Sequence, residues 1–189
     1  MDAAFTPVPS STKRYDTADM RHPRLWMGPV EIDAFRAARV KDSDHCGWAA
    51  FLDKSVAPWL ARDVMPEPAP YPDDTKVVSI WRQTYVACQE LIYAIRHLAI
   101  AGTILQDPSL VAQAKKWLLA AASWDPTGPT SRGYAPDWAF RVNVALAWGY
   151  DWLFDELSDA ERATVRSALA RRTRETAAHI IEHASIHLF

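Results

Sequence analysis

The sequence predicts an all-α fold built of antiparallel helical hairpins, and two observations lead to this prediction. Apolar side chains recur at helical spacing over most of the 189 residues, with proline- and glycine-containing stretches between the periodic segments. Helices that are apolar on most sides alternate with helices that are apolar on one face only. That alternation is expected where each hairpin has one enclosed helix and one outer helix.

Composition limits the class of protein. With 49% hydrophobic residues, the chain can bury a core as one domain. The 21 basic and 23 acidic residues give a net charge of -2, which provides no field of one sign to attract nucleic acid or an anionic membrane. No apolar run approaches the ~18 residues of a membrane span, and the first residues lack the apolar segment of a secretion signal. We therefore expect no nucleic-acid or membrane partner.

The chain as written is expected in the cytoplasm, or in the periplasm or outside the cell if a signal peptide was removed.

Helical periodicity predicts six helices, at residues 30–41, 44–62, 77–105, 108–121, 136–157 and 158–188. Residues 1–20 are polar and are expected to form an irregular arm, which an extended lead-in follows over 21–28. Pro58 should bend the second helix, and the proline-rich residues 65–74 form a stiff connector to the third.

The third and fifth helices are predicted to be enclosed by other helices, because apolar residues cover most of their surface. On the third helix the polar exceptions form one narrow stripe that faces either solvent or a cleft: Arg82 and Gln83, Gln89 and Glu90, Arg96 and His97. The fourth helix is amphipathic, with Asp107 as its cap and Pro108 in its first turn. At the start of the sixth, Ser158 and Glu161 fit a capping box.

These hairpins allow two architectures. One inner and one outer helix per hairpin build either a helical-repeat solenoid or a closed ring of hairpins, the (α/α) toroid. No sequence repeat of fixed period is visible, and this favours the toroid. The prediction for residues 21–189 is therefore a partial (α/α) toroid.

The stretch SWDPTGPTSRGYAPDW, residues 123–138, is longer than the usual connection between helices, and its aromatic residues argue against disorder. Trp124, Tyr134 and Trp138 bracket it. Aromatic faces beside hydroxyl groups and an arginine suit a sugar ring, whose C–H face stacks while its polar groups form hydrogen bonds. We interpret these three residues as candidate substrate contacts.

Two arginines are also candidates. Arg82 and Arg141 each lie on a helix that is otherwise almost wholly apolar, where a buried guanidinium needs an anionic partner. Either they form internal ion pairs with Asp137, Asp151 or Glu90, or they bind a carboxylate or sulfate of a substrate. The arginines of the last helix lie opposite its apolar residues and are interpreted as a solvated face: Arg166, Arg171, Arg172 and Arg174.

Metal and nucleophile patterns point to no further site. Cys46 and Cys88 lack the close spacing of a zinc site, and both are interpreted as core residues. The motif HIIEH, residues 179–183, has metal-ligand spacing, and His187 continues it by one turn. Such a metal site needs a further acidic ligand from a later helix, and the given sequence ends at Phe189. We therefore interpret the histidines as structural and expect no metal or other cofactor. The sequence contains no Ser/His/Asp nucleophile pattern and no phosphate- or nucleotide-binding fingerprint.

Four segments carry a resemblance to an enzyme family: HPRLW at 22–26, YVACQELIYAI at 85–95, AKKWLLAAASWDPTGPTS at 114–131 and AWGYDWLFDELSDAERATVRSAL at 147–169. Over residues 21–178 the chain resembles the heparinase II/III-like polysaccharide lyases, in the N-terminal part of their (α/α) toroid. Such enzymes cleave uronic-acid polysaccharides by β-elimination. The resemblance therefore implies an acidic polysaccharide or oligosaccharide as a partner.

The resemblance also implies how the chemistry is divided. In this family an amide, histidine or arginine neutralises the uronate carboxylate, a histidine or tyrosine removes the C5 proton, and a tyrosine protonates the leaving oxygen. The residues for proton transfer come from later toroid helices, which a β-sheet domain follows. The resemblance thus implies catalytic residues downstream of Phe189, and the remaining C-terminal part of the same enzyme as a second partner.

By the same resemblance, the loop would lie where the cleft of the toroid opens. Trp124, Tyr134, Trp138 and Arg141 would then be near the sugar. The alternative, from a different class, is a helical binding scaffold with no chemistry of its own.

Overall fold

A computed structural model of the chain describes residues 21–183, which contain six α-helices and no strand. The helices are α1 (Pro29–Lys41), α2 (Trp48–Phe51), α3 (Val78–Leu105), α4 (Pro108–Ser123), α5 (Pro136–Trp152) and α6 (Asp159–His183). The arm predicted for residues 1–20 lies outside the described residues. Within 21–183, no helix combines the length and the apolar character that a membrane span requires.

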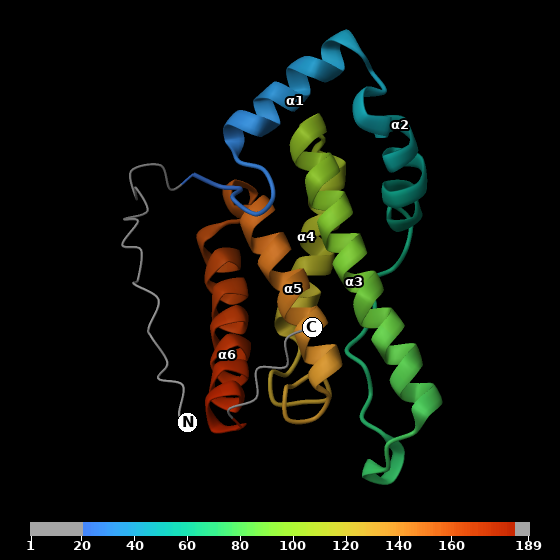
Figure 1. The fold of residues 1–189 in the computed structure, drawn as a ribbon, viewed down its shortest axis with the longest axis vertical. Helices are drawn as coiled ribbons and strands as arrows, with labels where there is room; N and C mark the ends of the chain where they lie inside the picture. Colours follow the sequence, from blue (N-terminus) through green and yellow to red (C-terminus); the bar gives the residue numbers. More distant parts are fainter. Residues whose placement is uncertain (1–20, 184–189) are drawn as a thin grey trace, which may run out of the picture.

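The four long helices form two antiparallel hairpins, α3 with α4 and α5 with α6 (Figure 1). The most extensive helix contact joins α3 to α5, which are the first helices of the two hairpins, and α4 packs against α6. One layer is therefore made by α3 and α5, and a second layer by α4 and α6. The predicted all-α fold of helical hairpins is confirmed.

The core lies where α3, α4 and α5 approach most closely. Leu91, Ile95 and Leu118 are fully buried there. A Cβ atom added at Gly149 of α5 would lie 2.6 Å from a methyl carbon of Leu118 and 2.8 Å from one of Ile95. The close approach of these helices therefore depends on a residue without a side chain at position 149.

The helix starts follow their predicted caps. At α4, the carboxylate of Asp107 accepts hydrogen bonds from the backbone N–H groups of Ser109 (2.8 Å) and Leu110 (3.4 Å). At α6, Glu161 accepts from the backbone N–H of Ser158 (2.8 Å), and the Ser158 hydroxyl accepts from the backbone N–H of Glu161 (3.3 Å). Both predicted caps, including the capping box, are confirmed.

Replacing Ser158 with alanine is expected to lower the free energy of unfolding by about 1 kcal/mol, because the first turn of α6 loses an acceptor for its N–H groups. Urea unfolding measures the loss. Ser167, which is exposed on the same helix, provides the matched control as Ser167→Ala. The cap would be contradicted if the two variants were equally stable.

The helix predicted for 44–62, with a bend at Pro58, is instead a series of short helical turns. This segment consists of a 3-10 turn at His45–Gly47, the short α2, a π-helical turn at Leu52–Val56 and a 3-10 turn at Ala57–Trp59. Pro58 has no N–H to donate to the carbonyl of Lys54, and its ring crowds that carbonyl, so a regular helix cannot pass through it. Cys46, interpreted as core, is instead exposed in the first turn, whereas Cys88 is buried as predicted.

Candidate functional site

The candidate residues lie at opposite ends of the helix layers. Because α3 and α5 run in the same direction, their first turns lie at one end together with the loop at 124–135 (Figure 1). The other end holds α1, α2 and the last turns of α3 and α5. We call these the loop end and the α1 end. The residues predicted to bind sugar belong to the loop end.

Arg172 of α6 holds the loop, and its interpretation as a solvated residue is wrong. Its side chain is only 1% exposed. The guanidinium donates hydrogen bonds to the carbonyl (2.8 Å) and hydroxyl (3.1 Å) of Thr130, and longer ones to the carbonyls of Asp125 (3.4 Å) and Trp124 (3.5 Å). Burial lowers the pKa of Arg172, and nearby carboxylates, Glu67 foremost, oppose that shift.

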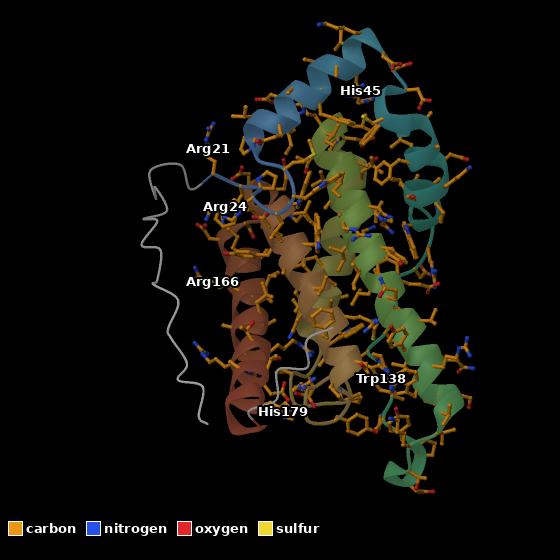
Figure 2. All side chains as sticks on the ribbon, viewed as in Figure 1. Arg21, Arg24, His45, Trp138, Arg166 and His179 are labelled. Atoms are coloured by element: carbon orange, nitrogen blue, oxygen red, sulfur yellow. The ribbon has the colours of Figure 1, made fainter. Side chains whose placement is uncertain are left out.

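The inward position of Arg172 follows from the period of α6. Val165 and Ala168, seven and four residues earlier on the same face, are both buried. The other three arginines of the predicted solvated face are exposed: Arg166, Arg171 and Arg174. Figure 2 shows Arg166 on the outward side of α6. The four arginines therefore divide between the two faces of the helix.

Two carboxylates fix the backbone of the loop. Glu175 of α6 accepts a hydrogen bond from the N–H of Gly133 (2.9 Å). Glu67, in the proline-rich connector, accepts one from the N–H of Asp125 (3.1 Å). The loop is therefore a structural segment that joins α6 to the connector.

The tryptophans of the loop are buried. Trp138 is 0% exposed and donates its indole N–H to the carbonyl of Trp81 (3.2 Å), and Trp124 is 5% exposed. Figure 2 marks Trp138 at the loop end. Tyr134 is half-buried, with its ring stacked on that of Tyr71 at 5.6 Å between centroids. In this arrangement both tryptophan rings are packing surfaces. Their role as sugar contacts stays a prediction that requires the loop to open.

The two candidate arginines have different surroundings. Arg141 lies over the ring of Tyr85, 3.5 Å from its centroid, and donates hydrogen bonds to the Tyr85 hydroxyl and to the carbonyl of Asp137 (2.9 Å). Arg82 is exposed in a shallow hollow on α3, and Glu90, which also lines that hollow, pairs with Arg62 (2.7 Å). The structure therefore places Arg141 of α5 against Tyr85 of α3, and it leaves Arg82 on an open surface.

A groove at the α1 end is lined by side chains that the sequence analysis did not assign to a site. It has a volume of about 770 Å³ and lies between α1, α2, α3 and the end of α5. Aromatic side chains line it: Trp26, Phe35, Trp48, Phe51 and Trp148. Arg96 and His97, the last pair of the polar stripe on α3, supply polar groups. We call this site the aromatic groove. Its size is that of a small-molecule site.

Arg96 lies beside two aromatic rings. Its guanidinium carbon is 5.5 Å from the ring centroid of Trp148 and 5.6 Å from that of Tyr93. It donates to Nε2 of His97 (3.3 Å), while Nδ1 of His97 lies 3.1 Å from the carbonyl of Ser55 and so carries the proton. Burial, and next the charge of Arg96, lowers the pKa of His97, which is neutral at pH 7. The groups that contact Arg96 within residues 21–183 are thus uncharged.

The lead-in reaches the groove and is held by α5. Asp151 lies 2.6 Å from Nδ1 of His22 and accepts hydrogen bonds from the backbone N–H groups of Arg24 and Leu25, both at 2.7 Å. From the sequence, Asp151 was one of three possible partners for an arginine. Its contacts are with the lead-in instead.

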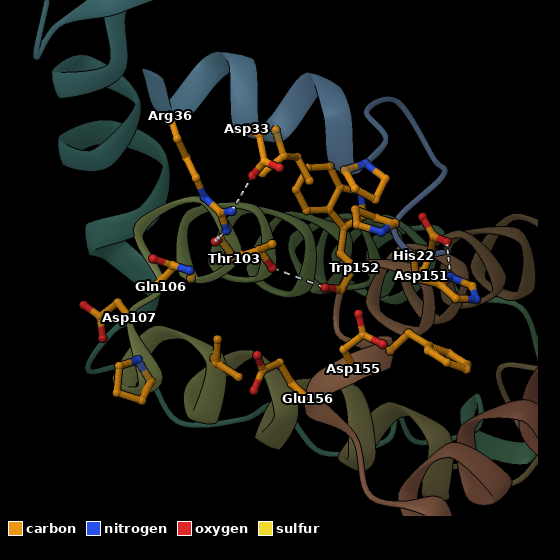
Figure 3. Close-up of a pocket in the computed structure, with 17 residues that line it drawn as sticks. His22, Asp33, Arg36, Thr103, Gln106, Asp107, Asp151, Trp152, Asp155 and Glu156 are labelled. Carbon is orange, nitrogen blue, oxygen red and sulfur yellow. Dashed lines mark hydrogen bonds and ion pairs between the residues drawn. The ribbon is translucent and has the colours of Figure 1, made fainter. Parts of the chain in front are cut away.

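A smaller cavity of about 340 Å³ adjoins the contact between His22 and Asp151 (Figure 3). On its other side Arg36 donates to Asp33 (3.0 Å) and to the carbonyl of Thr103 (2.6 Å). These polar groups bond one another, and they join α1 to α3 and the lead-in to α5.

No group of three or more His, Cys, Asp or Glu side chains that could hold a metal occurs in the part of the chain that the structure describes. In the HIIEH motif, the side chains of residues 180–183 are outside that part, as is His187. No protein-family model matches the chain, and no curated protein matches it.

Proposed function

We propose that the chain is the N-terminal portion of the (α/α) toroid of a polysaccharide lyase acting on uronic-acid-containing glycans, and that the aromatic groove binds the sugar. The observation that carries the proposal is Arg96, a cation whose contacts are uncharged and which lies beside aromatic rings in a groove. An acidic sugar is complementary to both the rings and the cation, because its C–H face stacks on aromatic rings and its carboxylate pairs with a guanidinium.

The layers of helices support the toroid. In such a ring, α3 and α5 would be inner helices and α4 and α6 outer helices, and each further hairpin would extend both layers. Phe140 of α5 is 63% exposed and Val86 of α3 is 48% exposed. These apolar side chains are surfaces that neighbouring parts of a ring would cover.

In this proposal the chain binds sugar but does not cleave it. Elimination needs a base for the C5 proton and an acid for the leaving oxygen, and each contributes roughly 10²–10⁴-fold to the rate. The resemblance assigns both groups to residues downstream of Phe189.

Ultraviolet detection of unsaturated uronate ends tests this division, with heparin, heparan, hyaluronan, chondroitin and alginate as substrates. We expect no product from this chain, and product from a protein whose reading frame continues beyond Phe189. Product from this chain alone would contradict the assignment and make the histidines at 179–187 the next candidates.

Replacing Trp148 with alanine is expected to weaken binding of an acidic oligosaccharide about tenfold, or about 1.4 kcal/mol, because both a stacking surface and the ring beside Arg96 are lost. Isothermal titration calorimetry with a uronate oligosaccharide measures the change. An uncharged oligosaccharide of equal length is the ligand control. Phe140→Ala is the matched variant, since Phe140 is also an aromatic residue of α5 and is exposed outside the groove. Equal effects of the two substitutions, or no binding by the unmodified chain, would overturn the proposal.

The same titration separates the groove from the loop end. Arg141→Gln is expected to change affinity little, because Arg141 is already bonded to Tyr85 and Asp137. Arg82→Gln should also have little effect, since Arg82 is exposed away from the groove. Loss of binding in either variant, with none in Trp148→Ala, would move the sugar site to the loop end.

A further inference from the structure

Trp26 has a backbone conformation that bulky residues rarely adopt. Its φ is 75°, and the residue is 71% exposed. The N–H of Met27 donates to the carbonyl of Leu25 (3.0 Å), which closes a three-residue turn with Trp26 at its centre. A tryptophan in this position gains neither burial nor a relaxed backbone. Residues held in this way are concentrated at ligand sites.

The strained turn places Trp26 at an exposed edge of the aromatic groove. Its ring centroid is 6.5 Å from that of Trp148 and 6.2 Å from that of Trp152. Trp148 in turn lies beside Arg96. The indole rings of Trp148 and Trp26 therefore extend the groove outward from Arg96.

The backbone before Trp26 is fixed from α5. Leu25 donates its N–H to Asp151 (2.7 Å), and its carbonyl accepts from the indole N–H of Trp152 (2.9 Å). Asp151 is also in contact with His22 and Arg24, and it is absent from the residues that line the groove. The carboxylate thus holds the segment that presents Trp26 without reaching the groove itself.

We propose that Trp26 is a stacking platform for a sugar ring next to the one whose acid group pairs with Arg96, and that Asp151 is the residue that positions it. This inference rests on the proposed function, which supplies the acidic oligosaccharide as ligand. Glu31 is the acidic side chain lining the groove, and its carboxylate accepts the N–H of Gly28 (3.0 Å) at the start of α1. Glu31 keeps its negative charge, so among the described residues that line the groove Arg96 is the cation that can pair with an acidic ligand.

Trp26→Gly tests the platform. Glycine adopts positive φ at no steric cost, so the turn can keep its shape while the ring alone is lost. We expect at least about fivefold weaker binding of a uronate oligosaccharide, with a thermal midpoint that is unchanged or higher. Trp26→Phe, which keeps a smaller ring, should retain part of the affinity.

The outcomes separate this inference from the proposed function. Wild-type affinity in Trp26→Gly, with weaker binding in Trp148→Ala, would overturn the platform and leave the proposed function standing. Absence of binding by the unmodified chain would overturn both.

A double-mutant cycle tests the positioning role. Asp151→Asn should weaken binding when Trp26 is present and have no further effect in Trp26→Gly, whereas Asp155→Asn, at a nearby exposed carboxylate, should have no effect in either. Additive losses would show that Asp151 does not act through Trp26. If Asp151→Asn does not fold, His22→Gln takes its place in the cycle, because it removes only one of the contacts of Asp151.

Discussion

Replacing Arg172 with methionine is expected to lower the free energy of unfolding by about 3 kcal/mol or more, because several buried oxygens lose their donor at once. These are the carbonyl and hydroxyl of Thr130 and the carbonyls of Trp124 and Asp125. Methionine fills much of the same volume but donates nothing. The loss therefore reports the hydrogen bonds of the guanidinium more than its packing.

Urea unfolding of Arg172→Met measures this loss, and Arg171→Met is the matched control. Arg171 is the exposed neighbour on the same helix, so its replacement should change stability by no more than about 0.5 kcal/mol. Arg172→Lys should recover only part of the loss, because an ammonium lacks the planar fork of donors. Hydrogen exchange at the N–H of Gly133 should accelerate in Arg172→Met. An Arg172→Met protein as stable as the unmodified chain would contradict the role of Arg172.

Replacing Asp151 with alanine is expected to cost about 3 kcal/mol as well, because a largely buried carboxylate is the partner of the His22 ring and of two backbone N–H groups. Hydrogen bonds to charged groups contribute about 1.5–3 kcal/mol each, and bonds that share one acceptor are not additive. The lead-in should detach from α5 when they are lost.

Asp155→Ala is the control for Asp151→Ala, since Asp155 is exposed close by in sequence. Urea unfolding compares the two variants, and hydrogen exchange at Arg24 and Leu25 reports the lead-in directly. Unchanged protection of those two N–H groups in Asp151→Ala would contradict the contact.

The two substitutions should differ in their effect on binding. Arg172 lies at the loop end, so a folded Arg172→Lys protein should bind sugar in the aromatic groove as the unmodified chain does. Asp151 supports Trp26 at the α1 end, so its replacement should reduce both stability and affinity. This contrast distinguishes a general loss of stability from a local effect on the groove.

The sequence by itself determined most helix boundaries, because the groups that set them are neighbours in the chain. Asp107 and Ser158 cap helices through N–H groups one turn away, and Pro108 and Pro136 begin helices with a preset φ. Where the prediction was wrong, at 44–62, Cys46 and Gly47 have positive φ and a π-helical turn precedes Pro58, neither of which periodicity specifies. The candidate site was less predictable. Its one sequence signal was the pair Arg96 and His97, the part of the polar stripe that lines the groove.

Tertiary structure alone decided which polar residues became structural and where the aromatic faces meet. The period of α6 puts Arg172 on the face of Val165, but its hydrogen-bond partners lie in a loop 42 residues earlier in the chain. Asp151 contacts His22 across 129 residues. Trp26 and Trp148 likewise meet only after the lead-in folds back on α5. Helical propensity and capping act within a few residues, whereas burial and ion or hydrogen-bond partners depend on how distant segments pack, and this is why only the folded chain reveals them.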